Sequence, residues 1–441
     1  MINDLIYGAF EISKIINGTL VGKNCLVNSI SLDSREIGEN VCFFAIKGEK
    51  FDGHNYVNEA VKNGAKLIVA QKKINASVSV IYVDDVIKAL GLLGKHHKGH
   101  TKVIAVTGSV GKTTVKNMIM SVLRQQYSVC GTEKNYNNEI GVPLTLLGIK
   151  SEDYCVIEMG MRGLGQIDWL AYLCQPEIVV VTNCTDAHLE KLKTRDNIFK
   201  AKMEILNYEP KYAVMPFEDR FLNYDYKTTN VTFLGKNGDN WVESIEEGDG
   251  FLKVTLTTGQ EYTLNTLLSC NANNSLIAYT IGKYLDISNK KIFEGLSKYE
   301  KEENREEIIK LGQTTIINDC YNASFQSMKE AILSAKRYSK ICNKRLYVLL
   351  GDMLELGDES EELHVKIGRI CRDSGVDKVF LYGNLVKFIQ IGFESGEIID
   401  DSDENVKNIA KQIEGGVLLV KASRRLNLEK FVYKLKEKLD E

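Results

Sequence analysis

Residues 103–119, VIAVTGSVGKTTVKNMI, join an apolar strand, a glycine turn and a helix, and few folds contain this combination. Glycines in such a turn let successive backbone N–H groups point at phosphate oxygens, and the helix that follows begins with a partial positive charge. The pattern therefore predicts a phosphate-binding loop for a nucleotide. The residues of this loop are Gly108, Ser109, Val110, Gly111, Lys112, Thr113 and Thr114.

Two side chains of the loop suit ATP chemistry. Lys112 can reach the terminal phosphates, and the Thr113 hydroxyl can bind Mg²⁺. The loop departs from the strict pattern G-x-x-x-x-G-K-[ST], because its first position is Val106. A glycine turn before an ordinary helix is the alternative interpretation, but the strand before the turn and the Lys-Thr-Thr after it favour a nucleotide site.

Short apolar runs alternate with helix-like stretches along most of the chain, which is typical of parallel sheets with helices on both faces. The length of 441 residues corresponds to about three domains. We expect an α/β protein with a small α/β domain over 1–98, a central parallel-sheet domain with the phosphate loop over 99–310, and a Rossmann-like domain over 311–441. Residues 231–268, which include VTFLG, favour antiparallel hairpins.

The composition excludes several classes of protein. Lys and Arg number 56 against 59 Asp and Glu, and the net charge of −3 argues against a nucleic-acid-binding protein. No apolar run is long enough to cross a membrane, and the N-terminus does not resemble a secretory signal, so no membrane insertion is expected. The 10 Cys are scattered without a C-x-x-C pair. That pattern fits a reducing compartment, and we expect a cytoplasmic protein.

Metal ligands are expected near the phosphate loop. Glu158 ends the apolar run CVIEMG, and His188 follows the run EIVVVTN. Because the carboxyl ends of parallel strands meet at one edge of a sheet, both side chains could hold Mg²⁺ together with Thr113. For His188 alone, a structural role is the alternative. The His-rich stretch GKHHKGH at 94–100 offers no carboxylate partner and is interpreted as a solvated linker.

Together these segments resemble the Mur ligases, ATP-dependent enzymes that form amide bonds during peptidoglycan precursor synthesis. The resemblance covers nearly the whole chain. Its motifs are TG-x-x-GKTT at 107–114, E-M-G at 158–160, T-N-x-x-x-A-H-L-E at 182–190 and A-K-x-E-I at 201–205. Further segments are most similar to the family member that uses D-alanyl-D-alanine: 33–37, 43–57, 135–147, 319–332 and 349–368.

The resemblance implies a reaction and its cofactors, ATP and Mg²⁺. ATP would phosphorylate the terminal carboxylate of a UDP-N-acetylmuramoyl tripeptide, and the amine of D-alanyl-D-alanine would attack the acyl phosphate. The partners would be small molecules, with no nucleic acid, and we expect a monomer. The alternatives are a divergent Mur ligase that joins another acid and amine, and a nucleotide switch that binds a partner. A switch would not need a separate C-terminal domain.

The resemblance also implies the site residues. The catalytic residues would be Lys112, Glu158, His188 and Lys202. The metal ligands would be Thr113, Glu158, His188 and Lys202, the last as a carbamate formed with CO₂. The nucleotide would also be contacted by Asn138, Asn274, Arg305, Asp319, Tyr321 and Asn322. The UDP substrate would be bound by Ser34, Arg35, Lys47, Asp52 and His54. A surface Lys on a helix is the alternative for Lys202, and a plain turn is the alternative for Ser34 and Arg35.

The chain departs from the family pattern at a few positions. Cys270 replaces a His, Asp186 a Pro, Asn304 and Ala422 each a Gly, and Ser324-Phe325 an Asn-Pro pair. None of these changes removes a residue expected to bind phosphate or metal. The changes at Cys270, Asn304 and Phe325 fall at or near the expected nucleotide edge, where adenine contacts would differ. A divergent member of the family would also carry such changes.

Overall fold

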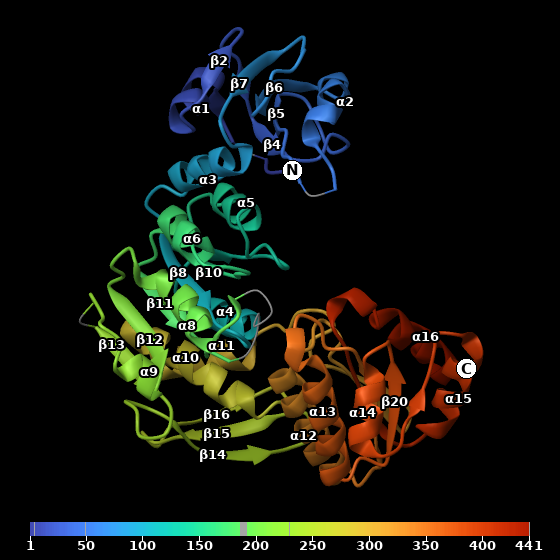
Figure 1. The fold of residues 1–441 in the computed structure, drawn as a ribbon. Coiled ribbons are helices and arrows are strands. Elements are labelled where there is room, and N and C mark those ends of the chain that lie inside the picture. Colours follow the sequence, from blue (N-terminus) through green and yellow to red (C-terminus); the bar gives the residue numbers. More distant parts are fainter. Residues whose placement is uncertain (4, 49, 186–191, 229, 441) are drawn as a thin grey trace. The chain divides into compact units, whose positions relative to one another are not determined.

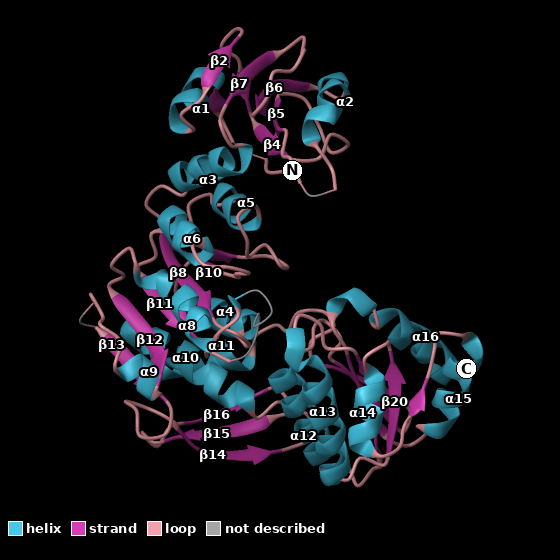
Figure 2. Cartoon of the chain, viewed as in Figure 1, coloured by secondary structure: helices cyan, strands magenta, loops and turns pink. Residues whose placement is uncertain are grey.

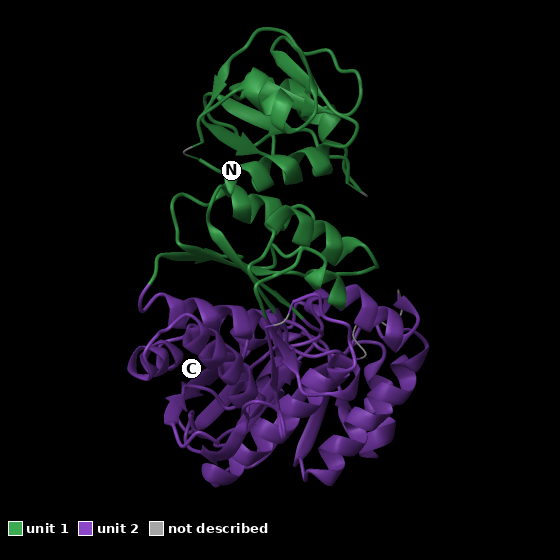
Figure 3. Ribbon diagram, turned by 90° about the vertical axis from the view of Figure 1, so that its left-hand side faces the viewer, with its two compact units in different colours: residues 1–107, 127–179, 203–212 green, residues 108–126, 180–202, 213–441 purple. Residues whose placement is uncertain are grey.

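The structure is a computed structural model that describes residues 1–441 except 4, 49, 186–191, 229 and 441. The chain divides into two compact units, shown in Figure 3. Unit 1 contains residues 1–107, 127–179 and 203–212, and unit 2 contains residues 108–126, 180–202 and 213–441.

The N-terminal part of unit 1 is a sheet with the strand order β2-β7-β6-β5-β4 (Figure 1). These strands are Thr19–Val21, Ser79–Tyr82, Ala65–Ala70, Val41–Phe44 and Ser29–Ser31. A small pair, β1 (Tyr7–Gly8) and β3 (Leu26–Val27), is antiparallel. The helices are α1 (Ala9–Ile15), α2 (Val57–Lys62) and α3 (Val86–His97), with a 3-10 helix at Gly53–Tyr56.

Helices cover both faces of this sheet. Alternate residues of β5 explain why, since Phe44 packs in the core that includes α1 and α3, and Phe43 packs in the core that includes α2. A strand buried on both faces has no polar alternation, which is the reason for the continuous apolar run CFFA. Asp85 starts α3, because its carboxylate accepts hydrogen bonds from the backbone N–H groups of Ile87 and Lys88.

The remainder of unit 1 has a parallel sheet with the strand order β8-β10-β9. These strands are Lys102–Thr107, Tyr154–Glu158 and Val129–Gly131. The helices are α5 (Gly141–Leu147) and α6 (Gln166–Cys174), with a 3-10 helix at Glu204–Leu206. Strand β11 (Ile178–Val181) contains the point where the chain passes from unit 1 to unit 2.

The first segments of unit 2 include α4 (Lys112–Leu123), which follows the glycine turn, and most of α8 (Arg195–Met203). Strands β12 (Tyr212–Pro216) and β13 (Val231–Leu234) pair in parallel, with the short helix α9 (Asp219–Leu222) between them. An antiparallel sheet follows, with β14 (Val242–Glu247), β15 (Leu252–Leu256) and β16 (Glu261–Leu264). Helices α10 (Cys270–Tyr284) and α11 (Asn289–Ser297) come next.

The C-terminal sheet of unit 2 has the strand order β17-β18-β22-β19-β20-β21. These strands are Glu307–Leu311, Thr314–Asn318, Val417–Lys421, Leu346–Gly351, Lys378–Tyr382 and Glu397–Ile398. Only β17 is antiparallel to its neighbour. The helices are α12 (Phe325–Ile341), α13 (Ser360–Asp373), α14 (Val386–Phe393), α15 (Asp403–Gln412) and α16 (Glu429–Asp440), with 3-10 helices at Gly357–Glu359 and Arg424–Leu426.

Helices also lie on both faces of this sheet, and strands and helices alternate along it (Figure 2). Val348 in β19 packs with residues of α12, α13 and α14, while its neighbour Leu349 packs with residues of α15 and α16. The α/β class with parallel sheets, predicted from the sequence, is therefore confirmed. Among the described residues no helix is long and apolar enough to cross a membrane.

Two sequence expectations are wrong. Residues 231–235 do not form a hairpin, since β13 is parallel to β12 and the helix α9 lies between the two strands in the sequence. The stretch 94–100 is not simply a solvated linker, because α3 continues to His97. The His97 ring is held between the Tyr7 hydroxyl at Nδ1 (2.9 Å) and the Ile149 carbonyl at Nε2 (2.9 Å).

Candidate active site

The glycine turn after β8 has the backbone that the sequence pattern predicts. Gly111 has a φ of +84° and forms the N-cap of α4, a conformation that favours glycine. A Cβ on Gly108 would lie 1.9 Å from the Thr182 Oγ1, so no other residue fits there. A Cβ on Gly111 would lie 3.0 Å from the Asn274 Oδ1. The two glycines thus let the loop lie close to side chains from distant segments.

Residues that follow β11 hold the loop in place. The Asn183 Oδ1 accepts hydrogen bonds from the backbone N–H groups of Ser109 (3.2 Å) and Val110 (3.0 Å). The Thr182 hydroxyl donates to the Val110 carbonyl at 2.6 Å, and the Ser109 hydroxyl donates to the Thr185 carbonyl at 3.0 Å. Thr182 and Asn183 begin the motif T-N-x-x-x-A-H-L-E, but the sequence analysis predicted no role for either residue. Their place directly after an apolar strand was the signal.

The Lys112 ammonium lies over its own loop. Its Nζ donates to the carbonyl oxygens of Gly108 (2.8 Å) and Ser109 (3.1 Å). A phosphate in the loop would offer a negatively charged acceptor in place of these neutral carbonyls, and charged hydrogen bonds are about twice as strong. The position of Lys112 therefore suits a phosphate-binding cation.

Lys202, near the end of α8, is buried rather than on the surface. Its exposed fraction is 1%. Burial, helped by the nearby positive charge of Lys112, lowers the pKa of the Lys202 ammonium to about 7. The alternative of a surface Lys on a helix is wrong. An amine with this pKa is about half neutral at pH 7, far more than an exposed lysine, and the neutral amine is the form that reacts with CO₂.

Arg305 brings a second cation to the start of α4. Its Nη2 donates to the Thr113 Oγ1 at 3.2 Å, and its guanidinium lies 4.0 Å from the centre of the Tyr321 ring. Arg424 lies 5.7 Å from the same ring. Within unit 2 the predicted nucleotide residues Thr113, Arg305 and Tyr321 thus lie together.

Asp319 and Asn322 lie at the carboxyl end of β18, next to the end of β22. The Lys421 Nζ contacts the Asp319 Oδ2 at 2.5 Å and the Asn322 carbonyl oxygen at 3.1 Å. This ion pair is buried, and removing one partner of a buried pair leaves a charge that is costly to keep. Lys421 therefore fixes the edge of the sheet where the ribose or adenine contacts are predicted.

Lys116 was not singled out from the sequence, although it lies in α4 only one turn beyond the loop. It is 3% exposed, and its Nζ lies 3.3 Å from the Glu302 Oε1. The Asn117 side chain donates to the Glu300 carbonyl at 3.2 Å. The segment 300–306, which carries Arg305, is thereby attached to α4. No short motif marks a lysine of this kind, because its partner is distant in the sequence.

Glu158 and Asn138 belong to unit 1. Glu158 ends β10 and is buried, and its Oε1 accepts from the Asn137 Nδ2 at 2.7 Å. The Asn138 Oδ1 accepts from the backbone N–H groups of Ile140 (3.1 Å) and Gly141 (2.8 Å), so this side chain caps the start of α5.

The residues predicted to bind Mg²⁺ fit that ion chemically. Thr113 and Glu158 offer oxygen ligands, which Mg²⁺ prefers, and a carbamate on Lys202 would offer another. His188 lies outside the described residues. Within the described part of the chain, no group of three or more His, Cys, Asp or Glu residues could hold a metal. A magnesium site would therefore also need hydroxyl, carbamate or phosphate oxygens.

The predicted uridine-nucleotide residues lie in the N-terminal part of unit 1. The Ser34 hydroxyl donates to the Glu59 Oε2 at 2.7 Å, so it is held by a side chain of α2. Arg35 is exposed and pairs with Asp33 through a contact of 2.6 Å. Hydrogen bonds from Arg35 lower the pKa of the Asp33 carboxyl to about 2. The segment is a turn, and it presents an exposed cation of the kind that binds phosphates.

His54 is held inside this region. Its side chain is 1% exposed, its Nδ1 contacts the Asp52 Oδ1 at 2.6 Å, and its Nε2 accepts from the Gln71 backbone N–H at 3.1 Å. Lys72 also pairs with Asp52, and hydrogen bonds from Lys72 and His54 lower the pKa of the Asp52 carboxyl. The backbone of the exposed Lys47 pairs with that of Asp52 in an isolated antiparallel β-bridge. Both ring nitrogens of His54 thus stabilise the fold, and its contact with substrate stays a prediction.

Comparison with family models identifies three matching segments in chain order. They are Mur ligase family, catalytic domain, at residues 26–98, Mur ligase middle domain at 106–282, and Mur ligase, glutamate ligase domain, at 304–424. Together these segments cover most of the chain.

Curated relatives match over almost their whole length. UDP-N-acetylmuramoyl-tripeptide–D-alanyl-D-alanine ligase from Bacillus subtilis strain 168 is 34% identical over 451 residues, covering 97% of this chain and 98% of that protein. The ligase of the same name from Escherichia coli K12 is 30% identical and covers 97% of this chain and 98% of that protein.

Solved structures agree with the sequence relatives. MurF from Acinetobacter baumannii matches with a TM-score of 0.91 and 28% identity, covering 99% of this chain and 100% of that one. MurF ligase from Thermotoga maritima, solved in complex with ADP, matches with a TM-score of 0.85 and 28% identity, covering 93% of this chain and 98% of that one. The fold and the sequence of this chain are thus similar to the same group of ligases.

Proposed function

This chain belongs to the Mur ligase family, and from that premise we propose that it joins D-alanyl-D-alanine to UDP-N-acetylmuramoyl-tripeptide with ATP, in peptidoglycan precursor synthesis. The observation that carries the proposal is the match of 34% identity that covers 97% of this chain and 98% of the Bacillus subtilis ligase. The phosphate loop and the similar structure with bound ADP support the use of ATP.

The proposed reaction has two steps. An oxygen of the tripeptide's terminal carboxylate attacks the γ-phosphorus of ATP, the bond to the bridging oxygen breaks, and ADP leaves. The free amine of D-alanyl-D-alanine then attacks the acyl carbon, phosphate leaves with its electron pair, and the amine loses a proton. Phosphorylation is needed because a carboxylate oxygen is otherwise a poor leaving group.

The loop residues would stabilise the charge that develops on the transferred phosphoryl group. Lys112 would exchange its bonds to Gly108 and Ser109 for bonds to phosphate oxygens. Arg305 would keep a second cation at the first turn of α4. Thr113, Glu158, His188 and Lys202 would hold Mg²⁺, which would neutralise phosphate charge when bound.

Lys202 is proposed to act as a carbamate. The ammonium would first lose one proton. The neutral amine nitrogen would then attack CO₂, a C–N bond would form as one C=O π bond breaks, and a second proton would leave, so that a cation becomes an anionic oxygen ligand. The burial of Lys202 and its lowered pKa support this step, because they favour the neutral amine. An ammonium at this place would repel Mg²⁺.

The proposed division of labour follows the three predicted domains. Residues 1–98 would bind the UDP substrate through Ser34, Arg35, Lys47, Asp52 and His54, residues 99–310 would bind ATP, and residues 311–441 would complete the nucleotide site. The order of the three family matches supports this division. We also propose that the protein acts as a monomer in the cytoplasm on small molecules alone.

The product's mass tests the proposed function. The purified protein is incubated with ATP, Mg²⁺, D-alanyl-D-alanine and UDP-N-acetylmuramoyl tripeptides that differ in the third residue. A UDP-linked pentapeptide with one ADP released per product is expected, and omission of either the acid or the amine should stop ADP release. Amide formation only with another acid or amine would instead indicate a divergent Mur ligase, and ADP release without either substrate would indicate a nucleotide switch.

A further inference from the structure

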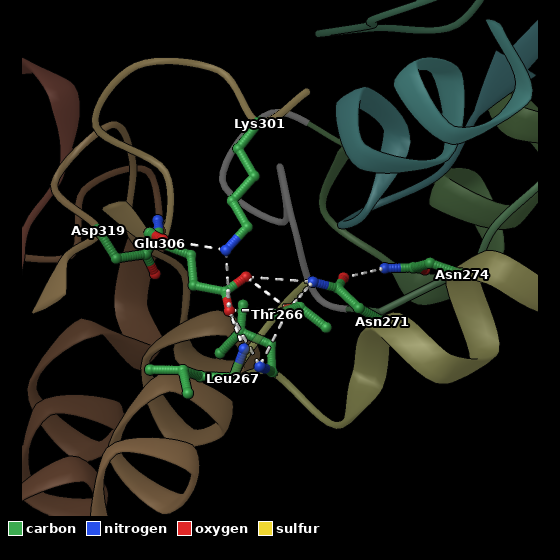
Figure 4. Close-up of polar contacts among 8 residues, drawn as sticks. Thr266, Leu267, Asn271, Asn274, Lys301, Glu306 and Asp319 are labelled. Carbon is green, nitrogen blue, oxygen red and sulfur yellow. Dashed lines mark hydrogen bonds and ion pairs between the residues drawn. The ribbon is translucent and has the colours of Figure 1, made fainter. Parts of the chain in front are cut away.

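Glu306 is a buried carboxylate in unit 2 that the proposed mechanism does not use. Its exposed fraction is 4%. Figure 4 shows its carboxylate surrounded by donors from the start of α10 and the segment before it. The donors are the Thr266 hydroxyl (2.7 Å), the backbone N–H groups of Leu267 and Leu268 (the latter at 3.2 Å), the Asn271 Nδ2 (3.2 Å) and, as an ion pair, the Lys301 Nζ (3.6 Å).

Burying a carboxylate is costly unless hydrogen bonds replace those lost to water, and these donors supply them. Burial raises the pKa of the Glu306 carboxyl, and the positive charge of Lys301 opposes that rise. The contacts connect α10 to the segment that follows Arg305. A carboxylate held this firmly fixes the orientation of whatever donates to it.

The next contacts lead from Glu306 to the phosphate loop. A carboxylate can only accept hydrogen bonds, so the Thr266 hydroxyl donates to Glu306. Asn271 must then turn its NH₂ group towards the Glu306 Oε2 (3.2 Å) and the Thr266 Oγ1 (2.8 Å), and its Oδ1 away. That Oδ1 accepts from the Asn274 Nδ2 at 2.8 Å, which turns the Asn274 Oδ1 towards Gly111. Figure 4 shows Asn271 between Glu306 and Asn274. The charge on Glu306 thus decides which end of the Asn274 amide faces the loop.

Glu306 also holds the backbone beside Arg305. Asn304 and Glu306 have φ values of +59° and +50°, a conformation that non-glycine residues keep only when surrounding contacts hold them. The Glu306 N–H donates to the Asp319 Oδ1 at 3.3 Å, and the Tyr321 N–H donates to the Asn304 carbonyl at 3.0 Å. Arg305, between these two anchored residues, reaches Thr113.

We propose that Glu306 is a positioning residue for ATP, which sets the amide orientation of Asn271 and Asn274 and thereby turns the Asn274 carbonyl oxygen towards the phosphate loop. The inference rests on the proposed use of ATP and deepens it. The Asn274 Oδ1 lies 3.0 Å from the position that a Cβ on Gly111 would take, and Glu306 acts on the nucleotide only through Asn271 and Asn274.

The variant Glu306→Gln tests the proposal with almost no change of shape. The introduced amide oxygen would remain with the Leu267 and Leu268 N–H groups, so the introduced NH₂ group would face the Asn271 NH₂ group. Asn271 and then Asn274 would have to flip, and an NH₂ group would face Gly111. We expect ADP binding, measured by calorimetry on the full chain, to weaken about tenfold. The matched control is Glu303→Gln, an exposed position in the same segment, which should bind ADP like the wild type.

The double variant Glu306→Gln/Asn271→Asp provides a rescue that a purely structural role does not predict. The introduced aspartate would accept from the NH₂ group of the introduced glutamine and from the Asn274 NH₂ group, so the Asn274 oxygen would again face Gly111. We expect ADP affinity within about threefold of the wild type. Asn271→Asp alone would place two carboxylates together and should weaken ADP binding more than Glu306→Gln does.

The outcomes separate this inference from the proposed function. Equal ADP affinity in Glu306→Gln and Glu303→Gln, or a loss that the double variant does not recover, would overturn the positioning role. If Glu306→Gln does not fold, the variant Asn271→Ala is used instead, because it leaves the backbone donors of Glu306 in place. The positioning role then requires that Asn271→Ala bind ADP more weakly than the wild type. A wild type that binds ADP but forms no pentapeptide refutes the proposed ligation alone, and a wild type that binds no nucleotide refutes both.

Discussion

At the scale of single residues, two lysines of unit 2, Lys112 and Lys202, are central to the reaction proposed for the phosphate loop. Lys112 belongs to the loop and Lys202 lies close to it, yet the two side chains have different surroundings. Lys112 donates to two carbonyl oxygens of its loop, whereas burial lowers the pKa of Lys202 to about 7. The two side chains therefore call for separate tests.

Replacing Lys112 by Ala should abolish most ligation while the fold survives, since the side chain is expected to balance phosphoryl charge. A loss of this kind of interaction lowers the rate on the order of 10²-fold or more. The measurement is ADP release with all substrates present, with circular dichroism to verify folding. Lys236→Ala, which removes an exposed lysine, serves as the control. Activity of Lys112→Ala within a few-fold of the wild type would rule out the phosphate role.

Replacing Lys202 by Ala should remove most activity, and added acetate should restore part of it by supplying a carboxylate. Removal of dissolved CO₂ should slow the wild type reversibly, because a carbamate forms only from neutral amine and CO₂. Lys200→Ala, an exposed position on the same helix, should respond normally to CO₂. Full activity of Lys202→Ala, or indifference of the wild type to CO₂, would speak against the carbamate.

Among the helices, α13 illustrates how one element makes stability depend on pH. His364 in α13 is fully buried, its Nε2 accepts from the Met353 N–H at 3.0 Å, and its Nδ1 donates to the Ser360 carbonyl at 2.6 Å. Burial lowers the pKa of His364 below its ordinary value of 6.5. The ring is therefore neutral in the folded protein and fixes the loop after β19 to the start of α13.

The free energy of unfolding should decrease as pH falls below about 6.5, because His364 binds its proton at a higher pH in the unfolded chain than in the folded protein. The loss is about 1.4 kcal/mol for each unit by which the folded pKa is lowered. Urea unfolding at pH 7 and pH 5.5 measures it. His364→Gln should reduce this pH dependence but not remove it, since burial also lowers the pKa of His97. His100→Gln, at an exposed position, should leave the dependence intact.

At the scale of the whole molecule, the residues proposed for the two substrates belong to different units. The predicted UDP-substrate residues, such as Ser34 and Arg35, belong to unit 1, and the loop with Lys112 and Arg305 belongs to unit 2. Transfer of a phosphoryl group requires the acid and the γ-phosphate in direct contact. Binding both substrates should therefore favour an arrangement that places these residues around one pair of reacting groups.

Small-angle scattering should show a smaller radius of gyration when the protein is saturated with a non-hydrolysable ATP analogue and the UDP-muramoyl tripeptide than without ligand. Each ligand alone should give a smaller change, because neither alone spans the residues of both units. An unchanged radius with both ligands bound, verified by calorimetry, would contradict ligand-driven closure.

The sequence alone determined the features that depend on local order. The glycine turn between β8 and α4, the parallel strands that are apolar on both faces, and the β15–β16 hairpin each follow from the residues of a short segment. The motifs of the phosphate loop and of segments 135–147 and 349–368 also indicated the family, since long specific strings rarely recur by chance.

Only the tertiary structure decided which distant groups meet. Arg305 contacts Thr113 across 192 residues, Lys202 is buried although its helix looks polar, and β13 pairs in parallel with β12. No sequence pattern marks Glu306, because its proposed role depends on the hydrogen-bond donors that surround it in the fold. The physical reason is that local conformation follows from neighbours in the chain, whereas the cost of burying a charge is set by the partners that packing supplies.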